Sequence, residues 1–69
     1  MADVVSNLKE IRRRKRTPVD TLAERARVSR SMIYDIEAGN HLPGLEVAYK
    51  LAHALGSHIE EVFPFQNAG

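Results

Sequence analysis

Cysteine is absent from this sequence of 69 residues. Its absence excludes disulfide bonds and thiolate metal sites, which support many very small domains. No apolar run approaches the roughly 18 residues that a membrane helix needs, and the N-terminus lacks the basic and then apolar layout of a signal peptide. We therefore expect one cytoplasmic domain over residues 1–69, stabilised by regular helix packing or self-association, with no membrane contact.

Groups for catalysis, metal binding and base stacking are also sparse. His41, His53 and His58 include no i, i+4 pair that would place two imidazoles on one helical face, so we expect neither a metal nor a cofactor. No serine, histidine and acid form a recognisable catalytic arrangement, and a chain this small has little room for a buried cleft. Tyr34 and Tyr49 are too few for a single-strand stacking platform. We predict that the protein is not an enzyme, and no small-molecule effector site is evident.

Charge is distributed unevenly along the chain, although the net charge is only +1. Residues 1–30 contain nine Lys and Arg against four acids, whereas the remainder contains one Lys against five acids. Such asymmetry indicates one end that faces a polyanion and one end that faces solvent. A basic helix can equally be no more than a solvated surface.

Local signals predict two helices in the first part of the chain. Ser6 can cap a first helix in which Leu8 and Ile11 recur at helical spacing and the last turns are basic. Thr17 and Pro18 form a second start signal, a capping hydroxyl followed by a proline at the first helical position. This second helix is expected to bury Val19, Leu22, Ala23 and Ala26.

Three further helices are predicted at short intervals. Ser29 can cap a third helix, which ends in a left-handed turn at Gly39. Gly44 precedes a fourth helix, and a short fifth helix from about Ser57 ends before Pro64. The fourth helix is expected to bury a stripe formed by Leu45, Ala48, Leu51, Ala52 and Leu55. The fifth is expected to bury Ile59, Val62 and Phe63.

Only about three residues join the second and third predicted helices, which is the layout of a helix-turn-helix. Projection of the third helix at about 100° per residue places Met32, Ile33 and Ile36 on the core side. The opposite arc carries Arg30, Ser31, Tyr34, Asp35 and Ala38. Arginine can bridge two guanine acceptors, serine can bond either way, tyrosine can contact phosphate or a thymine methyl, and aspartate can accept from cytosine. An ordinary solvated face could have the same composition.

Several segments together carry a family resemblance. They are Leu8-Lys9-Glu10-Ile11-Arg12, Leu22-Ala23-Glu24, Val28-Ser29-Arg30-Ser31-Met32-Ile33, Ile36-Glu37-Ala38-Gly39, Pro43, Leu45-Glu46 and Leu51-Ala52-His53-Ala54-Leu55-Gly56. Over residues 8–63 the chain resembles, without a gap, the Cro/CI-type or XRE family of helix-turn-helix proteins. The resemblance implies a mainly α, lambda-repressor-like bundle of five helices over about residues 6–63. It also implies sequence-specific binding of double-stranded DNA by a homodimer on a pseudo-palindromic operator, and a transcriptional repressor of prokaryotic or phage origin.

The resemblance also implies roles for individual residues. Arg30, Ser31, Tyr34 and Asp35 would face bases. Phosphate contacts would come from Thr17, Val19, Ser29, Asn40 and His41. The basic run at the end of the first helix adds Arg14 and Arg16 as candidates for phosphate contact. Arg12 and Glu37 would form an ion pair between the first and third helices, although Arg12 can also be interpreted as one more member of the DNA-facing basic run.

Three positions depart from the family pattern. Val19 stands where the family commonly has glutamine, which leaves only backbone amides around Thr17 and Val19 to hold a phosphate there. Arg16 and Arg27 each replace a frequent glycine. A non-glycine residue in a left-handed turn costs about 1 kcal/mol or more, so these two turns could be remodelled.

Apolar residues remain outside the regular helical stripes at both ends of the chain. Val4, Val5, Phe63 and Phe65 could extend the bundle with a short two-stranded β-ribbon from segments 1–5 and 64–69, which would pack on the bundle or against a second subunit. Alternatively, Phe63 closes its own core and Phe65 is part of a tail. A second function also stays open, namely a protein-binding adaptor or antitoxin-like module that keeps the fold and holds a partner through this tail.

Overall fold

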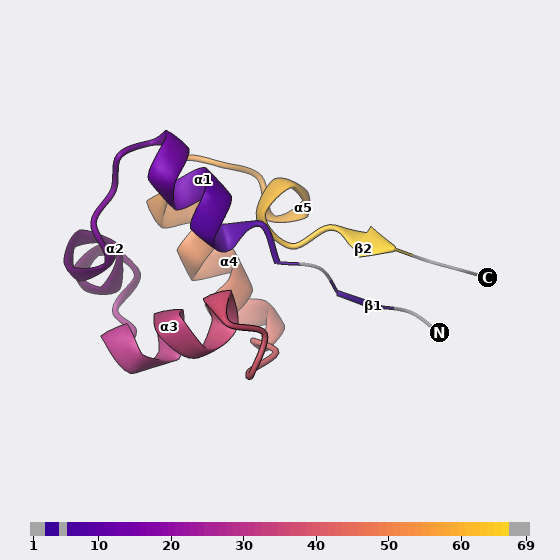
Figure 1. The fold of residues 1–69 in the computed structure, drawn as a ribbon. Coiled ribbons are helices and arrows are strands. Elements are labelled where there is room, and N and C mark those ends of the chain that lie inside the picture. Colours follow the sequence, from indigo (N-terminus) through magenta and orange to yellow (C-terminus); the bar gives the residue numbers. More distant parts are fainter. Residues whose placement is uncertain (1–2, 5, 67–69) are drawn as a thin grey trace.

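The computed structural model describes residues 3–4 and 6–66 of the chain, and the side chains of residues 6–64. This part contains five helices, α1 (Leu8–Arg14), α2 (Val19–Ala26), α3 (Arg30–Glu37), α4 (Leu45–Ala54) and α5 (Ile59–Val62). Two strands of two residues, β1 (Asp3–Val4) and β2 (Phe65–Gln66), pair antiparallel with Val4 opposite Phe65 (Figure 1). The prediction of a mainly helical fold is confirmed. Within the described ranges, no helix is both long enough and apolar enough to span a membrane.

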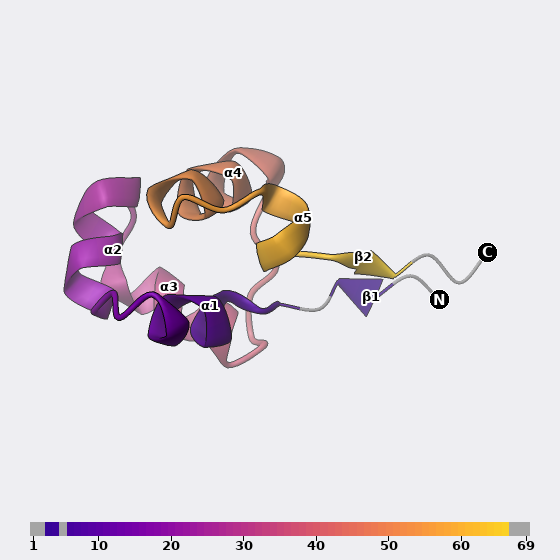
Figure 2. The same cartoon turned by 90° about the horizontal axis from the view of Figure 1, so that it is seen from above.

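The helices enclose a single apolar core. Figure 2 shows α4 on one side and α1 with α3 on the other, while α2 crosses one end of the bundle. Helix α5 lies toward the opposite end, and β1 and β2 extend away from the bundle beside it (Figures 1 and 2). The largest of the residues that are less than 2% exposed come from every helix, namely Leu8, Leu22, Ile33, Ile36, Leu51 and Val62. Their shared burial couples all five helices in one folding unit.

Helix α1 begins one residue later than the Ser6 cap predicts. Asn7 occupies the N-cap position, and the Ser6 hydroxyl accepts a 3.3 Å bond from the Leu8 amide. Asn7 itself donates to the last turn of α5, from its backbone amide to the Val62 carbonyl at 2.7 Å and from its side chain to the Glu61 carbonyl at 3.2 Å. These bonds join the start of the bundle to its end and bring β1 and β2 together.

Helix α2 also begins one residue later than predicted. Pro18 occupies the N-cap position with extended backbone, and Thr17 does not cap the helix. The Thr17 side chain is buried instead, and its hydroxyl donates to the Lys15 carbonyl at 3.3 Å. The Thr17 amide donates to the Arg12 carbonyl at 2.9 Å. The prediction of a Thr17 cap is wrong because both polar groups of Thr17 complete the turn that ends α1.

The two turns that could have been remodelled both keep left-handed geometry. Arg16 has φ 52° and Arg27 has φ 57°, the region that favours glycine. In each turn the following residue donates its amide to a carbonyl five residues earlier, which closes the end of the preceding helix. These bonds run from Thr17 to Arg12 at 2.9 Å and from Val28 to Ala23 at 3.1 Å. The helix-ending bonds therefore hold the arginine backbones in place despite the unfavourable φ.

Helix α4 is preceded by Gly44, as predicted, but its buried stripe is shorter than predicted. Ala48, Leu51, Ala52 and Leu55 are buried, whereas Leu45 is 76% exposed. Leu45 is the first residue of the helix, where the chain enters from the solvent-exposed loop after α3. Val47 packs against the core near this end instead. The prediction that Leu45 is a core residue is therefore wrong.

Phe63 follows α5 directly and is only 2% exposed. It belongs to the same core cluster as Leu8 and Val62. Phe63 therefore closes the core of its own chain, and the prediction that it forms part of an apolar surface for a second copy is corrected. Of the other terminal residues predicted to lie there, Val5 is outside the described residues, and the side chains of Val4 and Phe65 are outside the described side chains.

Candidate nucleic-acid interface

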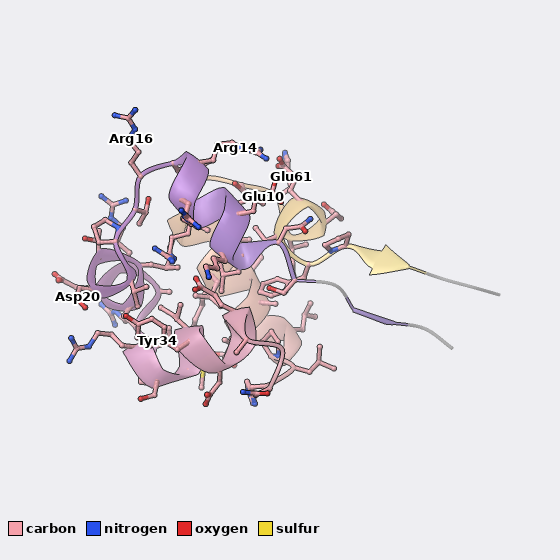
Figure 3. The ribbon with its side chains drawn as sticks, viewed as in Figure 1. Glu10, Arg14, Arg16, Asp20, Tyr34 and Glu61 are labelled. Atoms are coloured by element: carbon pink, nitrogen blue, oxygen red, sulfur yellow. The ribbon has the colours of Figure 1, made fainter. Side chains whose placement is uncertain are left out.

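Helix α3 presents a polar face to solvent and an apolar face to the core. Arg30, Ser31, Tyr34, Asp35 and Ala38 are all exposed. On the other side Ile33 and Ile36 are buried, and Met32 is half-buried against the core. The separation of the two faces follows the helical projection of the sequence. Figure 3 shows Tyr34 on α3 projecting away from the ribbon of its own helix.

A three-residue turn, Arg27, Val28 and Ser29, fixes how α3 sits on α2. The Ser29 hydroxyl accepts a 3.0 Å bond from the Met32 amide, which satisfies one of the free amides at the start of α3. Val28 packs against the core and so anchors the turn between the two helices. Because both Val28 and Ser29 are held in place, the first turn of α3 has a defined orientation. This is helix-turn-helix geometry.

Arg30 does not extend freely from the start of α3. Its Nη1 atom lies 3.2 Å from Oδ1 of Asp20, in the first turn of α2. Figure 3 shows Asp20 at the side of the molecule where α2 and the start of α3 lie. This contact was not among those predicted from the sequence. The sequence shows only that Asp20 and Arg30 carry opposite charges in the first turns of their helices, and the packing of α2 against α3 brings these two turns together.

Arg12 and Glu37 form an ion pair between α1 and α3. The Arg12 Nε donates to Glu37 Oε2 at 2.7 Å, and Nη2 donates to Oε1 at 3.3 Å. The Arg12 Nη1 also donates to the Thr17 carbonyl at 3.2 Å. All three guanidinium nitrogens of Arg12 are therefore used within the protein. This arrangement matches the structural interpretation of Arg12 and not its membership of a DNA-facing basic run.

Arg14 and Arg16 lie far from the exposed face of α3. In Figure 3 both are at the edge of the molecule where α1 ends, whereas Tyr34 lies on α3 at the other side of that view. Arg14 pairs with Glu10 one turn earlier on α1, at 3.0 Å. The structure therefore does not bring these two arginines together with the residues predicted to read bases. Their predicted contact with phosphate stays a prediction, and it would lie away from the exposed face of α3.

The remaining candidates for phosphate contact lie at the ends of α2 and α3. Val19 is the first residue of α2, where amides point out of the helix without carbonyl partners in their own helix. Ser29 precedes α3, and Asn40 and His41 are exposed in the segment after it. Thr17 departs from the prediction, because its amide and hydroxyl already donate to carbonyls of the preceding turn. The Asn40 amide donates to the Asp35 carbonyl at 2.8 Å, so only the side chain of Asn40 is available for a ligand.

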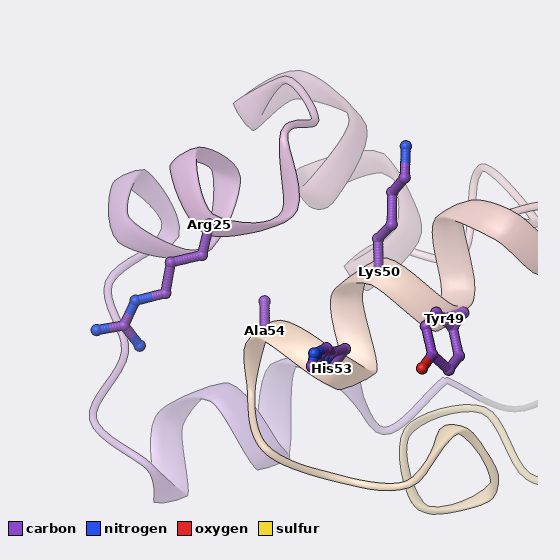
Figure 4. Close-up of a pocket in the computed structure, with 5 residues that line it drawn as sticks. All are labelled: Arg25, Tyr49, Lys50, His53 and Ala54. Atoms are coloured by element: carbon purple, nitrogen blue, oxygen red, sulfur yellow. The ribbon is translucent and has the colours of Figure 1, made fainter.

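A shallow depression of about 370 Å³ lies between α2 and α4. Figure 4 shows its lining, which is formed by Arg25, Tyr49, Lys50, His53 and Ala54. The rings of Tyr49 and His53 are 5.9 Å apart, and Lys50 pairs with Glu46 at 3.1 Å. This surface belongs to α2 and α4 and includes none of the exposed residues of α3. Across the described residues, no group of three or more His, Asp or Glu side chains gathers as a metal site would require.

Comparison with known families decides the interpretation of this geometry. A family model described as helix-turn-helix matches residues 8–62, from the first residue of α1 to the last of α5. The chain belongs to the helix-turn-helix family. The matched range includes the turn, both flanking helices and every residue of α3. The resemblance seen in the sequence is thereby confirmed at the level of the family.

Three archaeal relatives are also similar to this helix-turn-helix chain, and each is named an uncharacterized HTH-type transcriptional regulator. One from Archaeoglobus fulgidus is 35% identical over 60 residues, which cover 87% of this chain and 84% of the relative. One from Methanothermobacter thermautotrophicus is 41% identical over 51 residues, 72% of this chain and 74% of the relative. One from Methanocaldococcus jannaschii is 38% identical over 48 residues, 70% and 73% of the two chains.

Proposed function

We propose that this protein binds double-stranded DNA in a sequence-specific manner through α3 and thereby regulates transcription. The observation that carries the proposal is the exposed polar face of α3, held by the Ser29 cap and the three-residue turn to α2. A helix held in this way fits the major groove, where each base pair presents its own pattern of donors and acceptors. The names of the archaeal relatives support a role in transcription. The proposed role involves no catalysis.

The proposed base contacts come from Arg30, Ser31, Tyr34 and Asp35, which are exposed on the same face. Arg30 stands in the first turn of α3, the part of a recognition helix that reaches base edges. Its guanidinium can bridge the two acceptors of a guanine, which is worth about 1–3 kcal/mol of discrimination. Asp35 can accept a hydrogen bond from the amino group of a cytosine.

The proposed phosphate contacts flank this face. The first amides of α2, beginning at Val19, lie at the positive end of a helix dipole and suit a phosphate oxygen. Ser29, Asn40 and His41 lie at the two ends of α3, where the DNA backbone would pass on each side of the groove. These contacts would position the protein on the duplex without selecting a sequence.

The proposed assembly is a homodimer on a pseudo-palindromic operator, acting as a repressor in a prokaryotic cytoplasm. A symmetric dimer presents two recognition helices about one turn of DNA apart, roughly 34 Å, so that operator symmetry follows protein symmetry. The antiparallel pairing of β1 with β2 supports a role for the chain ends, because it places both at the same side of the bundle. Neither strand lies within the helix-turn-helix itself.

Selection from a randomised duplex library, followed by sequencing of the bound fraction, tests this function. The expected result is an enriched motif with two inverted half-sites. Arg30→Ala should relax the preference at one base in each half-site, whereas the matched control Arg14→Ala should leave the motif unchanged because Arg14 lies away from α3. A bound fraction without any enriched motif would contradict the proposal and favour a protein-binding module that keeps the fold.

A further inference from the structure

Asp20 is the only acidic side chain that contacts Arg30 in the described part of the chain. We propose that Asp20 is a positioning residue that sets the sequence specificity of DNA binding by acting through Arg30. This inference rests on the proposed function, since it concerns what Arg30 does when α3 enters a groove. Asp20 itself is not assigned a contact with a base.

The contact leaves most of the arginine available. It joins one guanidinium nitrogen, Nη1, to one carboxylate oxygen at 3.2 Å. A guanidinium carries five N–H donors in a rigid plane, so its remaining donors stay free to bridge the two acceptors of a guanine. Asp20 thus limits the rotamers of Arg30 while leaving an edge of the plane for the base. Less side-chain freedom is then lost when the complex forms.

The contact also changes how Arg30 interacts with arbitrary DNA. Binding to any duplex depends mainly on the number of phosphates that are neutralised by free cations. Asp20 compensates the charge of Arg30, and its own carboxylate lies in the first turn of α2, close to the proposed phosphate site at Val19. Asp20 therefore weakens attraction to every duplex. A guanine in the correct position still attracts Arg30, because it offers two acceptors to the guanidinium at once. The ratio of specific to non-specific affinity therefore rises.

A purely structural role does not account for this pair. The Arg30 side chain is 66% exposed and the Asp20 side chain is 75% exposed. Exposed ion pairs contribute little to folding because water and salt screen them. Glu24 provides a matched control, since it is an exposed acid on the same helix and forms no ion pair in the described part of the chain.

The test measures dissociation constants for a selected operator and a scrambled duplex over a range of salt concentrations. The variants are Asp20→Ala, Asp20→Glu, Glu24→Ala and Arg30→Ala, with the Asp20→Ala/Arg30→Ala double variant. Asp20→Ala should tighten binding to the scrambled duplex about two- to fivefold and steepen its salt dependence by roughly 0.9, the value for one additional phosphate contact. It should also weaken the preference for guanine at the position that Arg30 reads.

Asp20→Glu should restore both properties, and Asp20→Ala should have no effect on base preference when Arg30 is already alanine. Glu24→Ala should leave the base preference unchanged. If Asp20→Ala and Glu24→Ala behave alike, or if guanine preference is the same with and without Asp20, the proposal for Asp20 is overturned while the proposed function stands. A wild-type protein with no base preference overturns both.

Discussion

The carboxylate of Glu37 on α3 binds the guanidinium of Arg12 on α1 while only 7% and 14% of the two side chains are exposed. Two N–H···O bonds at 2.7 and 3.3 Å make the contact bidentate. Because Arg12 also donates to the Thr17 carbonyl, the same side chain connects α1, the turn before α2, and α3. The ion pair therefore helps to fix the orientation of the proposed recognition helix relative to α2.

Removal of one partner of this pair should strongly destabilise the fold. Glu37→Ala leaves the Arg12 charge largely buried without a counter-charge, a change that typically costs about 3–5 kcal/mol. Thermal and urea denaturation followed by circular dichroism measure the loss. Arg14→Ala is the control, because it removes an exposed pair with Glu10 on a single helix and should cost at most about 0.5 kcal/mol. Equal losses in the two variants would show that the Arg12–Glu37 pair contributes no more than a surface contact.

Glycine at the two left-handed arginines should stabilise the protein. Arg16 and Arg27 have φ 52° and 57°, and each pays a steric penalty of about 1–2 kcal/mol that glycine avoids. Glycine loses more backbone entropy on folding, about 0.5–1 kcal/mol, so the net gain expected from each substitution is about 0.5–1 kcal/mol. In a domain of this size such a gain raises Tm by roughly 2–8 °C. Unchanged or lower Tm values would indicate that the arginine side chains make compensating contacts.

The reverse substitution at Gly39 tests the same physical argument. Gly39 has φ +80°, and a Cβ at this position would meet nothing within 4 Å. Gly39→Ala therefore changes backbone strain without a steric clash, and it should destabilise the protein by about 1 kcal/mol. Chemical denaturation of Gly39→Ala beside Arg27→Gly should shift the midpoints in opposite directions. Shifts in the same direction would contradict an explanation based on backbone geometry.

Most of the fold could be predicted from local signals in the sequence. The apolar spacing in α2 and α3, the Ser29 cap and the short turn between these helices depend on neighbouring residues, and all of them appear in the structure. The capping prediction failed where two neighbouring helix ends compete for the same polar groups. Thr17 was expected to cap α2, but the end of α1 takes both of its donors. Phe63 could be interpreted from the sequence either as a core residue or as part of an outer surface, and the structure buries it in the core.

In the candidate site, too, some features could be predicted from the sequence and others could not. The exposed face of α3 follows from helical periodicity, so Arg30, Tyr34 and Asp35 could be assigned from the sequence alone. The distance of Arg14 and Arg16 from that face could not, because a run of basic residues does not reveal where the end of α1 points. The contact between Asp20 and Arg30 also depends on the tertiary arrangement, since the two residues are ten positions apart on different helices.

Substitutions at Ser29 should distinguish its effect on stability from its effect on DNA binding. Its hydroxyl caps α3 by accepting from the Met32 amide, so Ser29→Ala should cost about 1 kcal/mol of stability. Ser29→Asn and Ser29→Asp retain an acceptor and should keep most of the stability. If Ser29 lies against a phosphate, Ser29→Asp should nevertheless weaken binding to all duplexes, whereas Ser29→Asn should not. Ser29→Asp with full stability and unchanged affinity would place Ser29 away from the DNA backbone.

Phe63 and the residues that follow it should have different effects on stability and on self-association. Phe63 is buried in the core of its own chain, so Phe63→Ala should cost about 3–5 kcal/mol at every protein concentration. Deletion of residues 65–69 removes β2 and leaves this core intact. If the paired chain ends contribute to the proposed homodimer, the deletion should lower the sedimenting mass toward the monomer and make Tm depend less on protein concentration. It should also weaken operator binding more than non-specific binding, because the two half-site contacts no longer add. Sedimentation over a range of concentrations decides the point, since a truncated protein that stays fully dimeric would exclude the chain ends from the interface.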